Sequence, residues 1–232
     1  MAVTLRHLIL AFFLVGLGPA NSQAPPPYAL LETGSFHGDE VSLKQPRDWV
    51  GIFCKQGACE ARPMMIHTAR VHDEVVDEDS KANTGTSVTV SAPEQPLFLV
   101  RGVNATPRKI PAWFVGEEGL DAGDSFHGGF PSAGYALQVE GKKTEDEPLP
   151  KGSRLVFSHG SESQELFSLP KGGNDPYITV LWVGDLDGDG KPDLLVITSW
   201  HYNVSHKVLW LSSLAKPGQL VGLAAILETT GC

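Results

Sequence analysis

Short apolar runs alternate with turn residues along most of this chain. The runs are rich in Val, Ile, Leu and aromatic side chains, which pack well on a pleated sheet, and few of them show the 3.6-residue period of an amphipathic helix. The last run could instead form a short helix. The expected strands, in chain order, are residues 28–31, 49–53, 64–71, 86–90, 97–100, 110–115, 135–139, 155–157, 165–169, 177–183, 194–198, 207–211 and 220–227.

This pattern predicts an all-β protein with little helix, built as a sandwich or as layered antiparallel sheets. A complete propeller is not expected, because it needs at least four blades of four strands, about 16 in all. Segment 141–152 is charged and contains proline, so it is either an exposed loop or a link between two regions. The two regions would be 25–150 and 151–232, and one compact domain over 28–232 is the alternative.

Residues 1–24 have the form of a secretory signal peptide. Arg6 precedes an apolar stretch, 8–17, that is too short to span a bilayer comfortably. Small residues follow, and cleavage is expected after Ala20 or Ala24. No later apolar run is long enough for a transmembrane helix. We therefore expect an exported protein, periplasmic or extracellular, that does not insert into the membrane after cleavage.

The chain is acidic, with 18 Lys and Arg against 27 Asp and Glu and a formal net charge of −9. An acidic surface repels phosphate backbones, so nucleic acid is not an expected partner. Such a surface suits a protein that handles cations.

Three cysteines are present, and an exported protein can form disulfides. Cys54 and Cys59 flank a four-residue turn that contains glycine. If the segments on either side are antiparallel strands, the two thiols face each other at the neck of a hairpin. A Cys54–Cys59 bridge is the expected pairing, and a bridge from either residue to Cys232 is the alternative. The short loop would make the bridge stiffen the hairpin more than it stabilises the domain.

The strongest chemical signal is the stretch Asp-Leu-Asp-Gly-Asp-Gly-Lys-Pro-Asp at residues 185–193. Carboxylates occupy loop positions 1, 3, 5 and 9, and glycine occupies position 6. An ordinary Asx turn needs only one or two acids, whereas Ca²⁺ takes six to eight oxygen ligands and tolerates irregular geometry. We therefore expect a calcium site. The expected ligands are the carboxylates of Asp185, Asp187, Asp189 and Asp193 and the backbone carbonyl of Lys191.

The flanking runs identify the kind of calcium loop. An EF-hand needs two helices and a Glu at position 12, but β-branched and aromatic runs flank this loop and Val196 stands at position 12. The unit is therefore predicted as strand, loop, strand. Residues 183–196 resemble the core of an FG-GAP/VCBS-type repeat, found in integrin α-chain propellers and in bacterial surface proteins, whose aspartates bind Ca²⁺ in a hairpin loop. Residues 198–200 depart from the family's Gly-Ala-Pro, and the motif occurs once.

The resemblance implies one propeller-type calcium hairpin in a fold that is not a propeller. The region up to the C-terminus also resembles small exported bacterial proteins with a single such repeat. A second acidic run, 73–79, has five acids in seven positions but lacks the glycine and the odd-position regularity. A solvated loop is expected there rather than a second cation site.

These features predict an exported, calcium-stabilised β-domain with a structural or binding role at the cell envelope, with a protein or a glycan as its partner. The alternative is a hydrolase, or a carbohydrate-binding or carbohydrate-processing protein, that uses an acidic surface bearing Trp182, Trp200 and Trp210. No catalytic residue is assigned, because the sequence contains neither a nucleophile elbow nor the histidine pair of a zinc protease.

Overall fold

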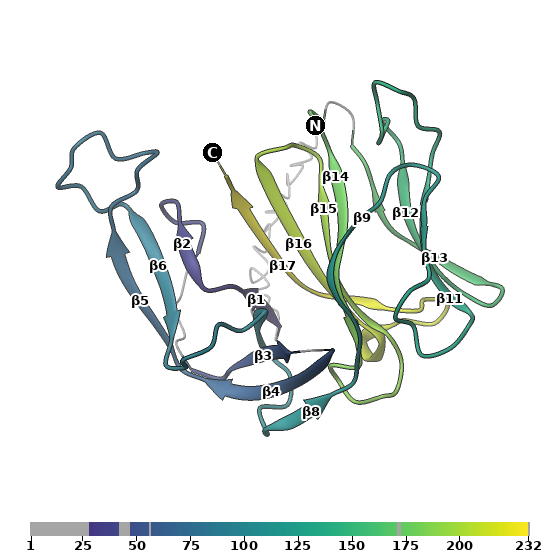
Figure 1. Cartoon of the computed structure of the whole chain (residues 1–232), viewed down its shortest axis with the longest axis horizontal. Coiled ribbons are helices and arrows are strands. Elements are labelled where there is room, and N and C mark those ends of the chain that lie inside the picture. The colour runs from purple at the N-terminus through teal and green to yellow at the C-terminus, as the bar shows by residue number, and fades with distance from the viewer. Residues whose placement is uncertain (1–27, 42–46, 56, 171–172, 232) are drawn as a thin grey trace, which may run out of the picture.

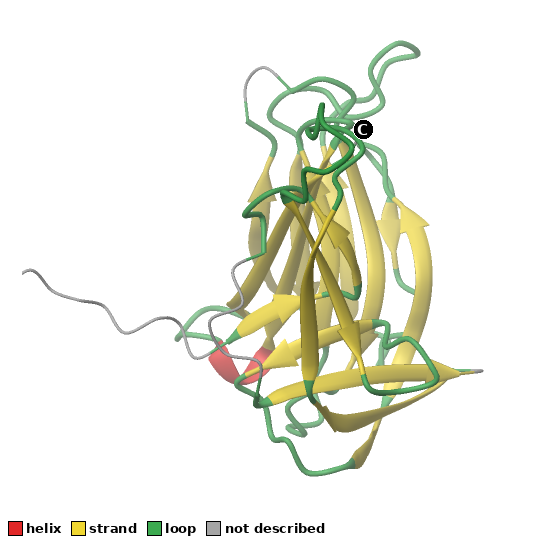
Figure 2. Ribbon diagram, turned by 90° about the vertical axis from the view of Figure 1, so that its left-hand side faces the viewer, coloured by secondary structure: helices red, strands yellow, loops and turns green. Residues whose placement is uncertain are grey.

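A computed structural model of the chain describes residues 28–41, 47–55, 57–170 and 173–231. The predicted signal peptide, its cleavage sites and Cys232 lie outside the described residues. Within the described ranges the fold is all-β, as predicted: four antiparallel sheets with no α-helix, and no closed barrel or propeller. One 3₁₀ turn, η1 (Ser212–Leu214), is the helical segment visible in Figure 2. No described helix is long and apolar enough to cross a membrane.

Two sheets come from the first half of the chain (Figure 1). The N-terminal sheet has the order β1 (Ala29–Leu31), β7 (Phe98–Arg101), β3 (Trp49–Lys55), β4 (Ala58–Met64) and β8 (Arg108–Ile110). The small sheet has the order β2 (Gly34–Phe36), β6 (Gly85–Val90) and β5 (Ile66–Val71).

The rest of the chain builds two further sheets. The central sheet has the order β17 (Gly222–Thr230), β16 (Val204–Leu211), β15 (Asp193–Ser199), β14 (Tyr177–Gly184) and β9 (Ala112–Gly119). The outer sheet has the order β10 (Ser125–Phe126), β11 (Tyr135–Glu140), β12 (Arg154–His159) and β13 (Glu162–Ser168). The last apolar run is therefore a strand and not a helix.

The central sheet is the middle layer of the fold (Figure 1). Successive side chains of a strand point to opposite faces, and here both faces are buried. Leu195 and Leu209 belong to the hydrophobic cluster shared with the N-terminal and small sheets. Leu194, Val196 and Val208 belong to the cluster shared with the outer sheet. Burial on both sides explains why β15 is a nearly continuous apolar run.

Two of the predicted strands are wrong as single elements. Run 64–71 divides into β4 and β5, which belong to different sheets, and Met65 lies 53% exposed at the corner between them. Run 110–115 divides at Pro111 into β8 and β9, because proline has no N–H for a sheet ladder. Both arms of each run have the composition of a strand, so composition alone does not reveal the corner.

Segment 141–152 connects β11 to β12, which pair as neighbours in the outer sheet. Of the two readings of this segment, the exposed loop is the one that fits this connection. The division of the chain into domains near residue 150 stays a prediction.

The predicted disulfide is present. Cys54 and Cys59 are directly opposite in the β3–β4 register and are bonded to each other. The bridge closes the neck of this hairpin, five residues apart in sequence. Because the closed loop is so short, we expect the bridge to act locally.

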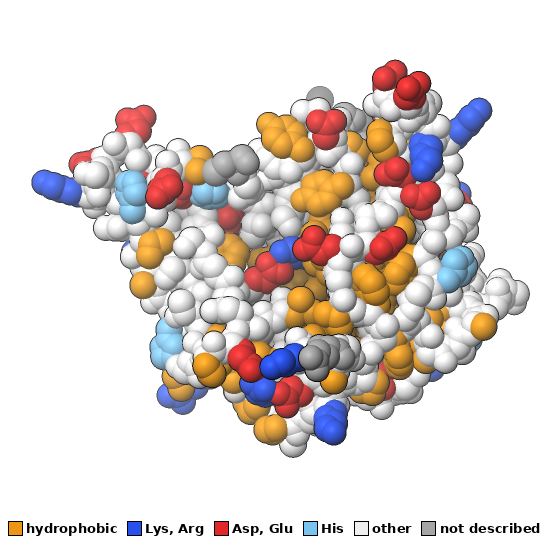
Figure 3. Space-filling model, in the orientation of Figure 1, with side chains coloured by type: hydrophobic (Ala, Val, Ile, Leu, Met, Phe, Trp, Pro, Cys, Tyr) orange, Lys and Arg blue, Asp and Glu red, His pale blue; other side chains and the backbone are white. Residues whose placement is uncertain are grey.

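Two of the three C-terminal tryptophans are core residues. Trp182 is fully buried and meets Phe98 edge to face, at 5.7 Å between ring centroids, and Trp210 is 5% exposed. Trp200 is partly exposed and packs against His206. Of the three, Trp200 is therefore the one that contributes to the surface. On the face shown in Figure 3, acidic and basic side chains are interspersed among apolar ones.

Candidate metal centre

The acidic loop connects β14 to β15 at the lower end of the central sheet in Figure 1. The two strands form the predicted hairpin, with Gly184 opposite Asp193 at its neck. The carboxylate of Asp185 accepts hydrogen bonds from the backbone N–H groups of Gly188 (2.7 Å) and Gly190 (3.0 Å). Both glycines have left-handed φ angles, +87° and +80°, that a side chain would disfavour. The turn of the loop therefore follows from residues within the loop: the Asp185 acceptor and the two glycines.

Three carboxylates converge inside this loop. Asp185, Asp187 and Asp193 each offer one oxygen, and these oxygens lie within 4.8 Å of one another. Asp193 is fully buried and Asp185 is 7% exposed. Like charges this close repel strongly where little water screens them, so the arrangement favours a bound cation.

Asp193 is the most enclosed member of this group. One of its oxygens accepts the N–H groups of Leu186 (2.6 Å) and Asp187 (3.2 Å), and the other accepts the N–H of Ser212 (2.7 Å). Burial raises the pKa of Asp193 to about 7, the charge of Asp187 adds to this, and the N–H donors act in the opposite direction. The protonation of Asp193 is therefore expected to change in the neutral pH range when no metal is bound.

The other two predicted ligands lie differently. Asp189 is exposed and is not part of the group of three. Its carboxylate accepts the N–H of Lys191 at 2.9 Å and lies 2.8 Å from the hydroxyl of Ser212. The carbonyl of Lys191 stays a predicted ligand. The structure thus brings together three of the four predicted aspartates.

Sequence reasoning missed the donors that come from η1, just after β16. The N–H of Ser213 donates to Asp187 at 3.1 Å. The hydroxyl of Ser212 lies 2.8 Å from Asp189 and 3.0 Å from Asp193, so its single proton is shared between two carboxylates. These serines orient the acids as supporting residues do around metal ligands. Nothing in the motif indicates them, because they lie beyond the next strand, β16.

The donor set suits a hard divalent cation. All the converging side-chain atoms are carboxylate oxygens, the ligands that Ca²⁺ prefers, and no histidine or cysteine belongs to the group. An irregular, glycine-containing loop also suits Ca²⁺ better than Mg²⁺, which demands near-ideal octahedral geometry.

Comparison with known families supports this reading. The FG-GAP repeat matches residues 179–208, which run from β14 through the acidic loop and β15 into β16. The chain therefore contains a single FG-GAP repeat within an all-β fold that is not a propeller. Searches of curated proteins and of solved structures found no significant match.

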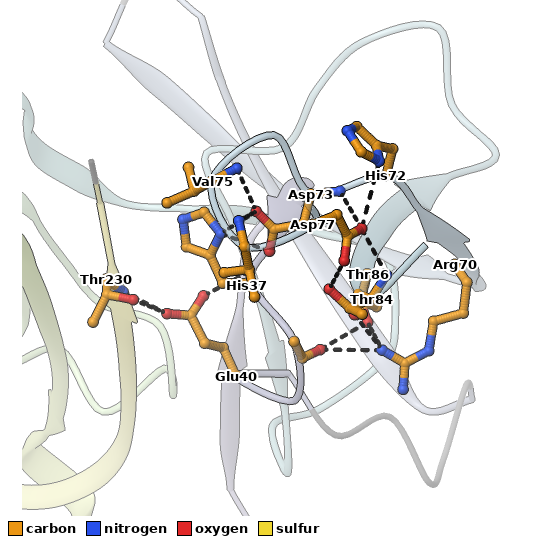
Figure 4. Close-up of polar contacts among 12 residues, drawn as sticks. His37, Glu40, Arg70, His72, Asp73, Val75, Asp77, Thr84, Thr86 and Thr230 are labelled. Atoms are coloured by element: carbon orange, nitrogen blue, oxygen red, sulfur yellow. Dashed lines mark hydrogen bonds and ion pairs between the residues drawn. The ribbon is translucent and has the colours of Figure 1, made fainter. Parts of the chain in front are cut away.

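The second acidic run, 73–79, has a different environment (Figure 4). The side chains of Asp73 and Asp77 are only 3% and 2% exposed, so two acids of the expected solvated loop are buried. The carboxylate of Asp73 accepts a hydrogen bond from the Nδ1 of His37 at 2.8 Å. The carboxylate of Asp77 accepts hydrogen bonds from the backbone N–H and the hydroxyl of Thr84. These contacts hold the loop closed. Among the described residues, the cluster at Asp185 is the one with three potential metal ligands.

A groove of about 840 Å³ lies beside the disulfide hairpin. Its two acids, Glu60 and Glu94, both pair with Arg62, whose guanidinium stacks over Phe53 at 4.5 Å. The hydrogen bond that Arg62 donates to Glu60 raises the pKa of the guanidinium. One arginine therefore engages both acids that line the groove.

Proposed function

We propose that this protein is an exported, calcium-binding β-domain in which the ion fixes the β14–β15 loop. The observation that carries the proposal is the convergence of three carboxylate oxygens within 4.8 Å, inside the matched FG-GAP repeat. Asp185, Asp187 and Asp193 would hold the ion, with Asp189 and the carbonyl of Lys191 completing its oxygen ligands. Bound calcium would neutralise the repulsion among these groups.

The role that follows is structural or binding rather than catalytic. A folded loop at one end of the central sheet is a stable platform for a protein or glycan partner at the cell envelope. An exported protein, periplasmic or extracellular, also meets calcium at concentrations that can fill a site of moderate affinity.

Calorimetric titration of metal-stripped protein with Ca²⁺ tests the proposal. We expect one saturable site in the full chain and at least a tenfold loss of affinity in Asp187→Ala. Asp146→Ala is the matched control, because Asp146 is an exposed acid in the loop between β11 and β12. Folded wild-type protein that binds no calcium would refute the proposal.

The supporting serines allow a finer test. Ser212→Ala removes the hydroxyl shared by Asp189 and Asp193 but keeps the backbone N–H that Asp193 accepts. We expect calcium affinity to fall about 10- to 100-fold, as when a residue that orients metal ligands is removed. Ser213→Ala is the control, since Ser213 reaches Asp187 through its backbone N–H. Equal affinities of the two variants would contradict a supporting role for the Ser212 hydroxyl.

A further inference from the structure

The metal loop contacts the N-terminal sheet as well as the central sheet. Leu186, which lies between the ligands Asp185 and Asp187, is fully buried. Its side chain belongs to the hydrophobic cluster between the central and N-terminal sheets, not to the cluster beneath the outer sheet. One residue of the loop is therefore part of the core that joins the two layers.

Two hydrogen bonds tie the same part of the loop to β8 and to Pro111, the residue between β8 and β9. The N–H of Asp185 donates to the carbonyl of Pro111 at 2.8 Å, and the guanidinium of Arg108 donates to the carbonyl of Leu186 at 2.6 Å. Arg108 also donates to the carbonyl of Asn104. Arg108 thus links the segment that precedes β8 to the metal loop.

Arg108 also contributes charge to the site. Burial lowers the pKa of its guanidinium, and the carboxylates of Asp185 and Asp187 oppose this shift. A single positive charge offsets the repulsion of three converging acids only in part. Without a metal, opening of the loop would relieve the remaining repulsion, and it would pull Leu186 from the core and break both hydrogen bonds.

We propose that the metal loop is the joint between the N-terminal and central sheets, with Arg108 as its positioning residue. Calcium occupancy then sets how firmly β8 and its neighbour β4 dock, and docking in turn raises calcium affinity, because coupling between two equilibria is reciprocal. The inference rests on the proposed calcium site.

Other contacts between the layers limit how far the effect reaches. Lys207 of β16 pairs with Glu32, and Glu40 accepts a hydrogen bond from the N–H of Thr230 at 2.6 Å (Figure 4). Neither contact involves the metal loop. Calcium removal is therefore expected to loosen the joint around β8 and not to separate the layers.

Hydrogen exchange of the full chain, with calcium and after metal removal, tests the joint. In wild type we expect calcium to slow exchange at least tenfold at 184–193 and also at 104–111 and 58–62. In Arg108→Met, the loop at 184–193 should stay protected by calcium while the effect at 104–111 is lost, and calcium affinity should fall several-fold. Arg154→Met is the control, because Arg154 pairs with Glu140 and Glu165 on the outer sheet.

The outcomes separate the two proposals. Absence of calcium protection at 184–193 would refute the calcium site itself. Protection at 184–193 without protection at 104–111 in wild type would overturn the joint and leave the calcium site standing. An Arg108→Met protein that behaves as wild type at 104–111 would likewise overturn it. Leu186→Met, which conserves volume in the core, should keep the coupling.

Discussion

Asp193→Ala is expected to lower the free energy of unfolding by about 3 kcal/mol or more, even without calcium. The substitution removes the acceptor of three backbone N–H groups, those of Leu186, Asp187 and Ser212. Leu186 and Ser212 are buried, so water does not readily replace the lost acceptor. A buried donor left without a partner costs about 1–3 kcal/mol. Asp193 therefore has two roles, one as a metal ligand and one as an anchor of the loop.

Urea unfolding followed by tryptophan fluorescence separates the two roles. Metal-free protein is compared at pH 5.5, where the Asp193 carboxyl is mostly neutral and a buried charge does not enter the comparison. Asp189→Ala is the matched control, since Asp189 is an exposed acid of the same motif. We expect it to unfold like wild type without metal and to lose part of the calcium response. Wild-type stability of metal-free Asp193→Ala would show that the buried hydrogen bonds contribute little.

Local sequence patterns determine much of this fold. The paired runs on either side of the acidic loop predict β14 and β15, and the turn between Cys54 and Cys59 predicts the β3–β4 hairpin and its bridge. The layering is not predictable in the same way. A run buried on both faces has the same composition whichever sheets cover it, so nothing in β15 indicates which layer lies on each side. The corners at Met65 and Pro111 depend on which neighbouring strand each arm finds.

The candidate site likewise has a part that local sequence predicts and a part that it does not. The spacing of the aspartates is local, and three of the four predicted ligands, Asp185, Asp187 and Asp193, converge in the loop. The groups that hold those carboxylates come from elsewhere in the chain. Ser212 comes from η1, which follows β16, and Arg108 comes from a different sheet. Such contacts arise from tertiary packing, and no spacing rule within the motif specifies them.

In metal-free protein, the contribution of Asp193 to stability is expected to fall as pH rises from about 4 to above 7. Burial raises the pKa of Asp193 to about 7 in the folded protein, against about 3.9 for an unperturbed Asp in the unfolded chain. A group whose folded pKa is raised contributes stability that is fully present below the unfolded pKa. That contribution is lost as pH rises through the folded pKa. A difference of about three pKa units corresponds to about 4 kcal/mol, which is an upper limit for this one group.

Calcium should reverse this trend, because the ion requires the ionised carboxylate and its binding displaces the proton. The stability difference between calcium-loaded and metal-free protein is therefore expected to be small near pH 5 and largest above pH 7. Urea unfolding across this range, in metal-stripped buffer with and without added Ca²⁺, measures both curves. Asp193→Asn is the control, since it keeps the shape of the side chain but cannot ionise. If metal-free wild type and Asp193→Asn show the same pH dependence, Asp193 does not titrate in this range. The buried carboxylate would then be stabilised by its N–H donors and not by the incoming ion.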